Sequence, residues 1–181
     1  MTKKVRIGCA SAFWGDTDTA APQLVNYGEI DYLVFDYLAE VTMSILAGAK
    51  QKDQHLGYAT DFIEHIGPLL HLIKEKNIKI ISNAGGMNLK SCRDALLKIA
   101  KEKDLGFQIA IVEGDNILDK QEDLRLLQVK EIDSGDLLPE NILSVNAYLG
   151  TAGIIKALEL GADIIITGRC VDSAVVLAPL M

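Results

Sequence analysis

Residues 78–103 read "IKIISNAGGMNLKSCRDALLKIAKEK", an apolar run followed by a glycine-containing turn and an amphipathic segment. The run at 78–82 is rich in β-branched residues and predicts a strand that is covered on both faces. The segment from Leu89 places its apolar side chains mostly on one face, and Asn88 is a suitable N-cap, so a helix is expected there. A strand, a turn and a helix in this order form the unit of a parallel α/β sheet.

Strands and helices are expected to alternate along the chain. Apolar runs that predict further strands occupy residues 5–10, 32–37, 108–113 and 163–168. Helical patterns fill the intervals at residues 20–28, 39–50, 61–76 (with a break at Gly67-Pro68) and 147–163. Such alternation implies right-handed βαβ units. We therefore predict one α/β domain over residues 1–181, with a mostly parallel, doubly wound, Rossmann-like sheet and helices on both faces.

Two segments depart from this alternation. Residues 115–146 are charge-rich and only weakly periodic, which predicts an excursion from the sheet. The excursion could be a lid or a partner surface, or simply a solvated connection. The apolar segment after residue 168 stops at Met181 without a cap or a closing element. We therefore expect a fold that is incomplete at its C-terminal end.

Composition excludes several classes of function. Apolar types make up 49% of the 181 residues, and the formal net charge is -7. That charge disfavours nonspecific binding to nucleic acid or to anionic membranes. The three cysteines form no CxxC pair and are odd in number, which favours a reducing compartment. No apolar run approaches the roughly 20 residues that cross a membrane. The expectation is a cytoplasmic protein that binds neither nucleic acid nor membrane.

The expected strand ends carry the candidate functional residues. Ligands of parallel α/β sheets bind beyond the carboxyl ends of the strands, and all five ends here are rich in small, polar or acidic residues. Paired carboxylates can separate their pKa values and act as acid and base. The candidates for that role are Asp36, Glu40, Glu113 and Asp115. The candidates for substrate contact are Ser11, Trp14, Asp16, Asn83, Gly85, Gly86, Asn88, Arg169 and Asp172.

Several candidates also have a structural explanation. Asp16 could merely cap the following helix, and Trp14 could cover the edge of the core rather than wall a pocket. Arg169 could pair with a neighbouring carboxylate instead of clamping a substrate anion. Cys9 and Cys170 lie near strand ends, but no histidine is placed to activate them. We interpret these two cysteines as core thiols.

The glycine turn lacks the motifs of a nucleotide-binding loop. No GxGxxG follows the first strand and no GxxxxGK[ST] string occurs, so neither NAD nor FAD is expected. "NAGG" resembles a motif of short-chain dehydrogenases, but Tyr148 is followed four residues later by Ala152 rather than by lysine. The N–H groups of Gly85 and Gly86, with Asn83, could instead bind an oxyanion or a carbonyl. A divalent metal, Mg²⁺ or Mn²⁺, held by the carboxylates is left open.

Taken in order, the strand-end strings resemble the acyclic terpene utilisation (AtuA-like) family. They are "GCASAFWGD" from Gly8, "DYLAEVTM" from Asp36, "SNAGGMN" from Ser82, "VEGDN" from Val112, and "NAYLGTAGI" with "GADIIITGRCVDSA" after Val145. Leu89 and Lys90 stand where many relatives have a proline. Family members are usually longer, so the resemblance implies that this chain is the N-terminal part of such a protein. The family is associated with bacterial breakdown of branched acyclic terpenes such as citronellol and geraniol, through CoA thioesters and alongside acyl-CoA carboxylases.

The resemblance and the strand-end residues together suggest a function. We expect a catabolic enzyme that acts on a small carboxylate or an acyl-CoA, by hydratase, lyase or other proton-transfer chemistry. The alternative is a noncatalytic subunit that partners an acyl-CoA carboxylase, with the excursion as its docking surface. In either case we expect a homo-oligomer.

Overall fold

A computed structural model describes residues 4–181 and contains one sheet of five parallel strands. The strands are β1 (Ile7–Ser11), β2 (Tyr32–Phe35), β3 (Lys79–Ser82), β4 (Ile109–Val112) and β5 (Ile164–Thr167). Their order across the sheet is β1-β2-β3-β5-β4, and every neighbouring pair is parallel. This arrangement confirms the predicted α/β fold and places one strand at each of the five predicted runs, although β1 ends at Ser11, one residue beyond its run.

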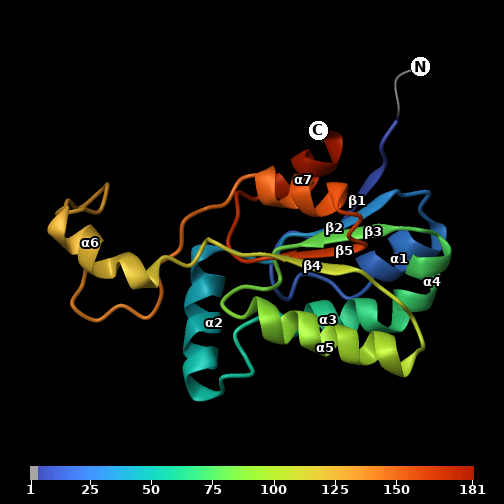
Figure 1. Ribbon diagram of the computed structural model, residues 1–181, viewed down its shortest axis with the longest axis horizontal. Coiled ribbons are helices and arrows are strands. Elements are labelled where there is room, and N and C mark those ends of the chain that lie inside the picture. The colour runs from blue at the N-terminus through green and yellow to red at the C-terminus, as the bar shows by residue number, and fades with distance from the viewer. Residues whose placement is uncertain (1–3) are drawn as a thin grey trace.

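Helices cover both faces of the sheet (Figure 1). They are α1 (Ala20–Tyr27), α2 (Glu40–Lys52), α3 (Thr60–Ile66), α4 (Leu70–Glu75), α5 (Leu89–Glu102), α6 (Gln121–Leu126), α7 (Ala152–Glu159) and α8 (Ala174–Leu177). Helices α1 to α5 contribute to the larger apolar core on one face, and α7 and α8 contribute to a smaller core on the other. In β5, Ile164 and Ile166 enter the larger core while Ile165 enters the smaller one. The consecutive isoleucines therefore follow from burial on both faces.

The chain reverses its direction across the sheet between β3 and β5. From β3 the chain passes through α5 to the edge strand β4, and it then returns through α7 to β5. The helix that follows β3, α5, packs on one face of the sheet, whereas the helix that follows β5, α8, packs on the other face. The carboxyl ends of β3 and β5 thus border a topological switch point, where ligands of open α/β sheets bind.

Two helix boundaries show how distant contacts act on local sequence. The break expected at Gly67-Pro68 is a 3₁₀ turn, Gly67–Leu69, between α3 and α4. The helix expected over 147–163 starts only at Ala152. Residues before it are extended because Leu149 pairs with Cys170 in a parallel bridge, with hydrogen bonds to Arg169 O and from Val171 N. This pairing joins positions that are far apart in sequence, so the local helical pattern did not predict it.

The excursion leaves the sheet after β4 through a paired neck. Asn116 and Asn146 form an antiparallel bridge, and Ile117 N donates to Val145 O at 2.8 Å. Beyond this neck, residues 117–145 form what we call the arm, which contains α6 and extends past α2, away from the sheet (Figure 1). The excursion therefore has a fixed base at the carboxyl edge of the sheet.

Candidate functional site

Asn83 holds the carboxyl of Asp36 at the ends of β2 and β3. The Asn83 side chain is fully buried. Its Oδ1 accepts a hydrogen bond from Tyr37 N at 2.7 Å, and its Nδ2 donates to Asp36 Oδ1 at 2.6 Å. The Asp36 main chain is fixed as well, because its N–H donates to Ser11 O at 3.1 Å. The short asparagine side chain thus orients one acid at the carboxyl edge of the sheet.

The surroundings of Asp36 favour its protonated form. Burial raises the pKa of the Asp36 carboxyl above its ordinary value, and the nearby Asp172 carboxylate raises that pKa further. The hydrogen bond from Asn83 and the charge of Arg169 act in the opposite direction. A carboxyl with a raised pKa at a ligand-binding edge is a candidate for proton transfer.

Arg169, which follows β5, is a buried cation at the same edge. Its side chain is 4% exposed. Nη1 donates to Cys170 O at 2.9 Å and to Asp172 Oδ1 at 2.7 Å, and Nη2 lies 3.4 Å from Glu40 Oε1. The guanidinium also stacks 4.0 Å from the centre of the Tyr148 ring. Within residues 4–181, its Nε finds no hydrogen-bond partner.

The carboxylates that face Arg169 differ from it in exposure. The side chain of Glu40 is 79% exposed and that of Asp172 is 63% exposed. A ligand carboxylate carries the same charge and could replace Glu40 or Asp172 at the guanidinium, because both of these side chains reach solvent. The structure therefore shows the pairing of Arg169 with neighbouring carboxylates, one of the two explanations that the sequence left open, and the clamping of a substrate anion stays a prediction.

Asp115 is buried, and one of its carboxylate oxygens accepts two hydrogen bonds. It is 2% exposed, and its Oδ2 accepts hydrogen bonds from Arg169 N at 2.8 Å and from Asn146 Nδ2 at 2.9 Å. The carboxylate lies so close to Gly168 that a Cβ there would be 2.3 Å from both carboxylate oxygens. These contacts favour a positioning role for Asp115 over the acid–base role expected from its place after β4.

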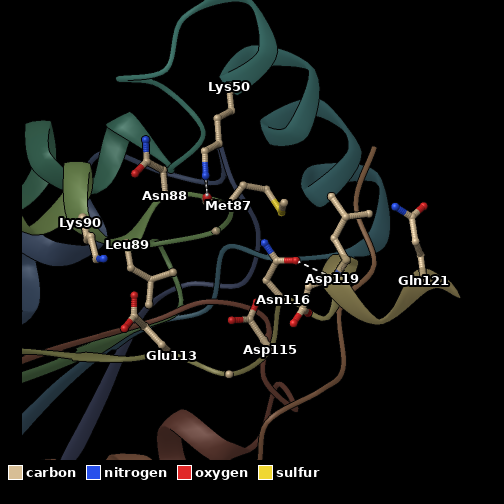
Figure 2. A pocket seen from close by; sticks show the side chains of 13 residues that line it. Lys50, Met87, Asn88, Leu89, Lys90, Glu113, Asp115, Asn116, Asp119 and Gln121 are labelled. Atoms are coloured by element: carbon tan, nitrogen blue, oxygen red, sulfur yellow. Dashed lines mark hydrogen bonds between the residues drawn. The ribbon is translucent and has the colours of Figure 1, made fainter. Parts of the chain in front are cut away.

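A cavity of about 670 Å³ lies beside this cluster, over the ends of β3 and β4 (Figure 2). Lys50 reaches into it from α2 and donates to Met87 O at 2.6 Å. The side chains that line the cavity belong to Lys50, Met87, Asn88, Leu89, Lys90, Glu113, Asp115, Asn116, Leu118, Asp119 and Gln121. Glu113 thus faces this cavity, whereas Asp36, Asn83 and Arg169 lie outside its lining. Asp115 belongs to both regions.

The glycine turn has a packing role in this structure. Gly85 N donates to Thr167 O at 3.1 Å, and Gly86 N donates to Asn83 O at 3.2 Å. A Cβ at Gly85 would lie 2.7 Å from Thr167 O, and one at Gly86 would lie 2.4 Å from Leu46 Cδ1. These N–H groups therefore join the turn to its neighbours. Neither N–H group is free to bind an oxyanion, which was the role expected for them.

The remaining candidates from the sequence are placed by local contacts. Asn88 caps α5 by accepting from Ser91 N at 3.3 Å and also donates to Leu56 O at 2.8 Å. Asp16 Oδ2 accepts from Ala12 N at 2.9 Å, within the loop after β1. Trp14 packs against the larger core. These contacts account for the positions of Asp16 and Trp14 within the fold, whereas Asn88 both caps α5 and lines the cavity.

Sequence reasoning overlooked three residues of this region. Tyr148 stacks on Arg169, and Lys50 and Lys90 line the cavity. Lys90 follows the cap of α5 and could have been found from its place in the first turn. Lys50 lies at the far end of α2, and Tyr148 was considered only as part of a dehydrogenase motif, so their positions required the tertiary structure.

The side chains of residues 4–181 include no group of three or more histidines, cysteines, aspartates or glutamates that could hold a metal ion. The carboxylates that were considered as ligands are divided between the Arg169 cluster and the cavity. Burial also raises the pKa of the Cys170 thiol, which keeps it in the unreactive form. We derive no step through a metal or a thiolate.

Comparison with known proteins gives one result. The family model described as acyclic terpene utilisation family protein AtuA matches residues 5–181. No curated protein and no solved structure matches the chain. In the part of the chain that the structure describes, no helix is long and apolar enough to cross a membrane. The strand-end strings and the match over residues 5–181 agree, and the chain belongs to the AtuA family of acyclic terpene utilisation proteins.

Proposed function

We propose that this chain carries the proton-transfer site of a catabolic enzyme that acts on a small carboxylate or an acyl-CoA during breakdown of branched acyclic terpenes. The observation that supports this proposal most strongly is that Asp36, whose pKa is raised by burial, lies within the electrostatic influence of the buried cation Arg169 at the same edge of the sheet. The first group can exchange a proton and the second can hold negative charge. Membership of the AtuA family supports the terpene-derived substrate.

The reaction that fits these groups begins next to a carbonyl. The ionised Asp36 carboxylate removes a proton from the carbon adjacent to the thioester or carboxylate carbon of the substrate. The electron pair of the broken C–H bond moves to the carbonyl oxygen, where the guanidinium of Arg169 stabilises the negative charge. Return of the proton from Asp36 regenerates the substrate. Where the next carbon carries a hydroxyl, its C–O bond breaks instead, a C=C bond forms, and the leaving hydroxide takes the proton from Asp36 as water, which is lyase activity. The reverse reaction adds water to the unsaturated compound and is hydratase activity.

The neighbouring cavity would hold the rest of the substrate. Its volume of about 670 Å³ lies within the range of small-molecule sites. Lys50 and Lys90 supply positive charge to an anionic group of the substrate, and Leu89 supplies an apolar contact. Glu113 lines the same cavity and is the second candidate acid or base. Asp115, which borders both regions, keeps Arg169 in place between them.

Proton exchange tests this proposal without knowledge of the product. The wild-type protein in D₂O should introduce deuterium next to the carbonyl of the CoA thioester of citronellic acid, whose α-carbon carries two exchangeable hydrogens, as detected by mass spectrometry. Asp36→Asn should abolish the exchange, while Asp18→Asn, an exposed acid in the loop after β1, should leave it unchanged. Exchange that persists in Asp36→Asn would assign the chemistry elsewhere.

The alternative function, a noncatalytic subunit of an acyl-CoA carboxylase, is favoured by the exposed aliphatic side chains of the arm. Leu126 is 83% exposed and Ile132 is 96% exposed. A subunit of this kind would retain carboxylase binding in the Asp36→Asn variant and would show no proton exchange. Co-purification of the variant and wild-type proteins with the carboxylase therefore separates the two functions.

A further inference from the structure

The arm, residues 117–145, is a preformed structure. The guanidinium of Arg125 in α6 donates to Pro139 O at 2.6 Å and to Glu140 O at 2.9 Å, which ties the helix to the returning chain. Further along, Lys130 and Leu137 form an antiparallel bridge, and Glu131 N donates to Asp136 O at 2.8 Å. A fixed surface loses little conformational entropy when it binds, which favours its use as an interface.

The arm exposes large aliphatic side chains on this fixed framework. Leu126 is 83% exposed, Leu127 74%, Ile132 96% and Leu137 60%. None of the residues of α6 is buried. The arm extends away from the sheet, so the two apolar cores of the domain do not cover these side chains (Figure 1). Aliphatic surface concentrated on a projection of this kind marks an interaction site.

The same chain carries an apolar groove at the open edge of the sheet. The edge strand β4 pairs with β5, and no other strand of residues 4–181 pairs its second side. A groove of about 500 Å³ runs along this edge between β4 and α7, and its lining includes Ile109, Ile111, Ala157 and Leu160. Leu160 is 71% exposed. Natural proteins cover or charge such edges, but the residues of β4 are all uncharged.

A second copy is better placed than the chain itself to fill this groove. The neck fixes the base of the arm through Ile117 and Val145, and through Asn146, which donates to the buried Asp115. For the arm to fold back over its own β4, these bonds would have to break. Because the arm begins just beyond the end of β4, a two-fold axis beside β4 brings each arm toward the groove of the other copy.

Size and the charge of α5 agree with this arrangement. Residues 117–145 contain seven acidic and three basic side chains, a net charge of -4. In the groove lining itself Lys156 and Glu113 balance, and Lys156 is paired with Glu159 at 3.0 Å, but α5 on the other face of β4 carries the exposed Lys98 and Lys101. An arm of 29 residues on each copy meets the roughly 20–30 residues per side of a stable interface. We propose that two copies of this chain form a two-fold dimer by arm exchange, each placing the aliphatic face of its arm in the β4–α7 groove of the other.

The mass of the chain in solution tests the proposal, independently of any activity. Sedimentation equilibrium at micromolar concentration should give twice the 19.7 kDa of one chain. An arm variant, Leu126→Ser with Ile132→Ser, and a groove variant, Leu160→Asp, should each weaken dimerisation at least about tenfold, since hot-spot truncations exceed 1–2 kcal/mol. Val41→Ser, which changes another aliphatic residue that is 67% exposed, should have no effect. Circular dichroism should show unchanged folding, because all four positions are exposed.

A mixing experiment identifies the contact itself. A heterodimer of the arm variant and the groove variant retains one intact contact, in which the normal arm lies in the normal groove. The mixture should therefore dimerise more strongly than either variant alone. A chain that carries both sets of substitutions has neither a normal arm nor a normal groove and should remain monomeric. A monomeric wild-type chain would overturn the proposal. A second result would also overturn it. If the arm variant lost the dimer while the groove variant still dimerised normally, the arms would be pairing with each other.

Discussion

Replacement of Gly168 by alanine tests the contact on which the position of Arg169 depends. A Cβ at residue 168 would lie 2.3 Å from both carboxylate oxygens of Asp115 and 2.5 Å from its Cγ. Ordinary contact requires a retreat of about 1 Å, because carbon and oxygen atoms pack at about 3.4 Å or more. The hydrogen bonds of Asp115 with Arg169 N and Asn146 Nδ2 now measure 2.8 and 2.9 Å. A shift of that size takes both beyond hydrogen-bonding distance.

The expected loss of stability combines two effects. Overpacking a filled site costs about 1–3 kcal/mol, and a buried acceptor without its donors costs about 1–3 kcal/mol more. We expect Gly168→Ala to lower the free energy of unfolding by about 2–5 kcal/mol. For a chain of this length, that loss lowers the melting temperature by roughly 5–20 °C. Urea unfolding followed by the fluorescence of Trp14, the only tryptophan, measures the free energy.

Two further variants isolate the cause. Gly150→Ala introduces a Cβ with no atom within 4 Å, so its free energy of unfolding should stay within about 0.5 kcal/mol of wild type. In an Asp115→Ala background the new methyl group has room, and Gly168→Ala should cost at least about 1 kcal/mol less than it does in the wild type. An equal cost in the two backgrounds, or a cost below 1 kcal/mol in the wild type, would refute the reasoning.

Three other substitutions test the neighbouring structure. Asn83→Ala leaves the buried N–H of Tyr37 without its acceptor at 2.7 Å, so urea unfolding should show a loss of about 2–4 kcal/mol. Because burial raises the pKa of Asp36 in the folded state, folding favours its protonated form, and the stability of the wild type should fall as pH rises from the unfolded pKa through the folded one. Asp36→Asn should remove that part of the pH dependence. The difference between the unfolding free energies of wild type and variant, measured at a series of pH values, would show it. Gly48→Ala, inside α2 with no atom within 4 Å of the new Cβ, should raise the free energy of unfolding by about 0.5–1 kcal/mol, and a thermal melt that shows no increase would count against it.

The parts of the fold that were predictable have local causes. The strands follow from β-branched runs such as residues 164–166, in which burial on both faces selects apolar residues at every position. The cap at Asn88 follows from the chemistry of its side chain, which satisfies an N–H group of α5. The strand-end rule also indicated where Asp36, Asn83 and Arg169 would lie, because β2, β3 and β5 are neighbours in the sheet.

The parts that were not predictable depend on distant contacts. Asp115 was expected to be an acid or base from its place after β4, but Arg169 and Asn146, which lie 54 and 31 residues later in the chain, make it a buried acceptor. The glycines of the turn were expected to bind a ligand, whereas their contacts with Thr167 and Leu46 explain them by packing. A residue type shows which bonds a side chain can make, but only the tertiary structure shows which partner is present.

The neck joins the proposed dimer contact to the proposed site. Asn146 bonds to Asp115, Tyr148 stacks on the guanidinium of Arg169, and Leu149 pairs with the segment that follows it. An arm held by a second copy would restrict the motion of the neck and so the orientation of Arg169. Because such coupling is reciprocal, the factor by which dimerisation changes the affinity of Arg169 for a carboxylate should equal the factor by which the carboxylate changes the stability of the dimer. Both proposals then have one physical basis, since the segment that places the arm is also the segment that holds the buried cation.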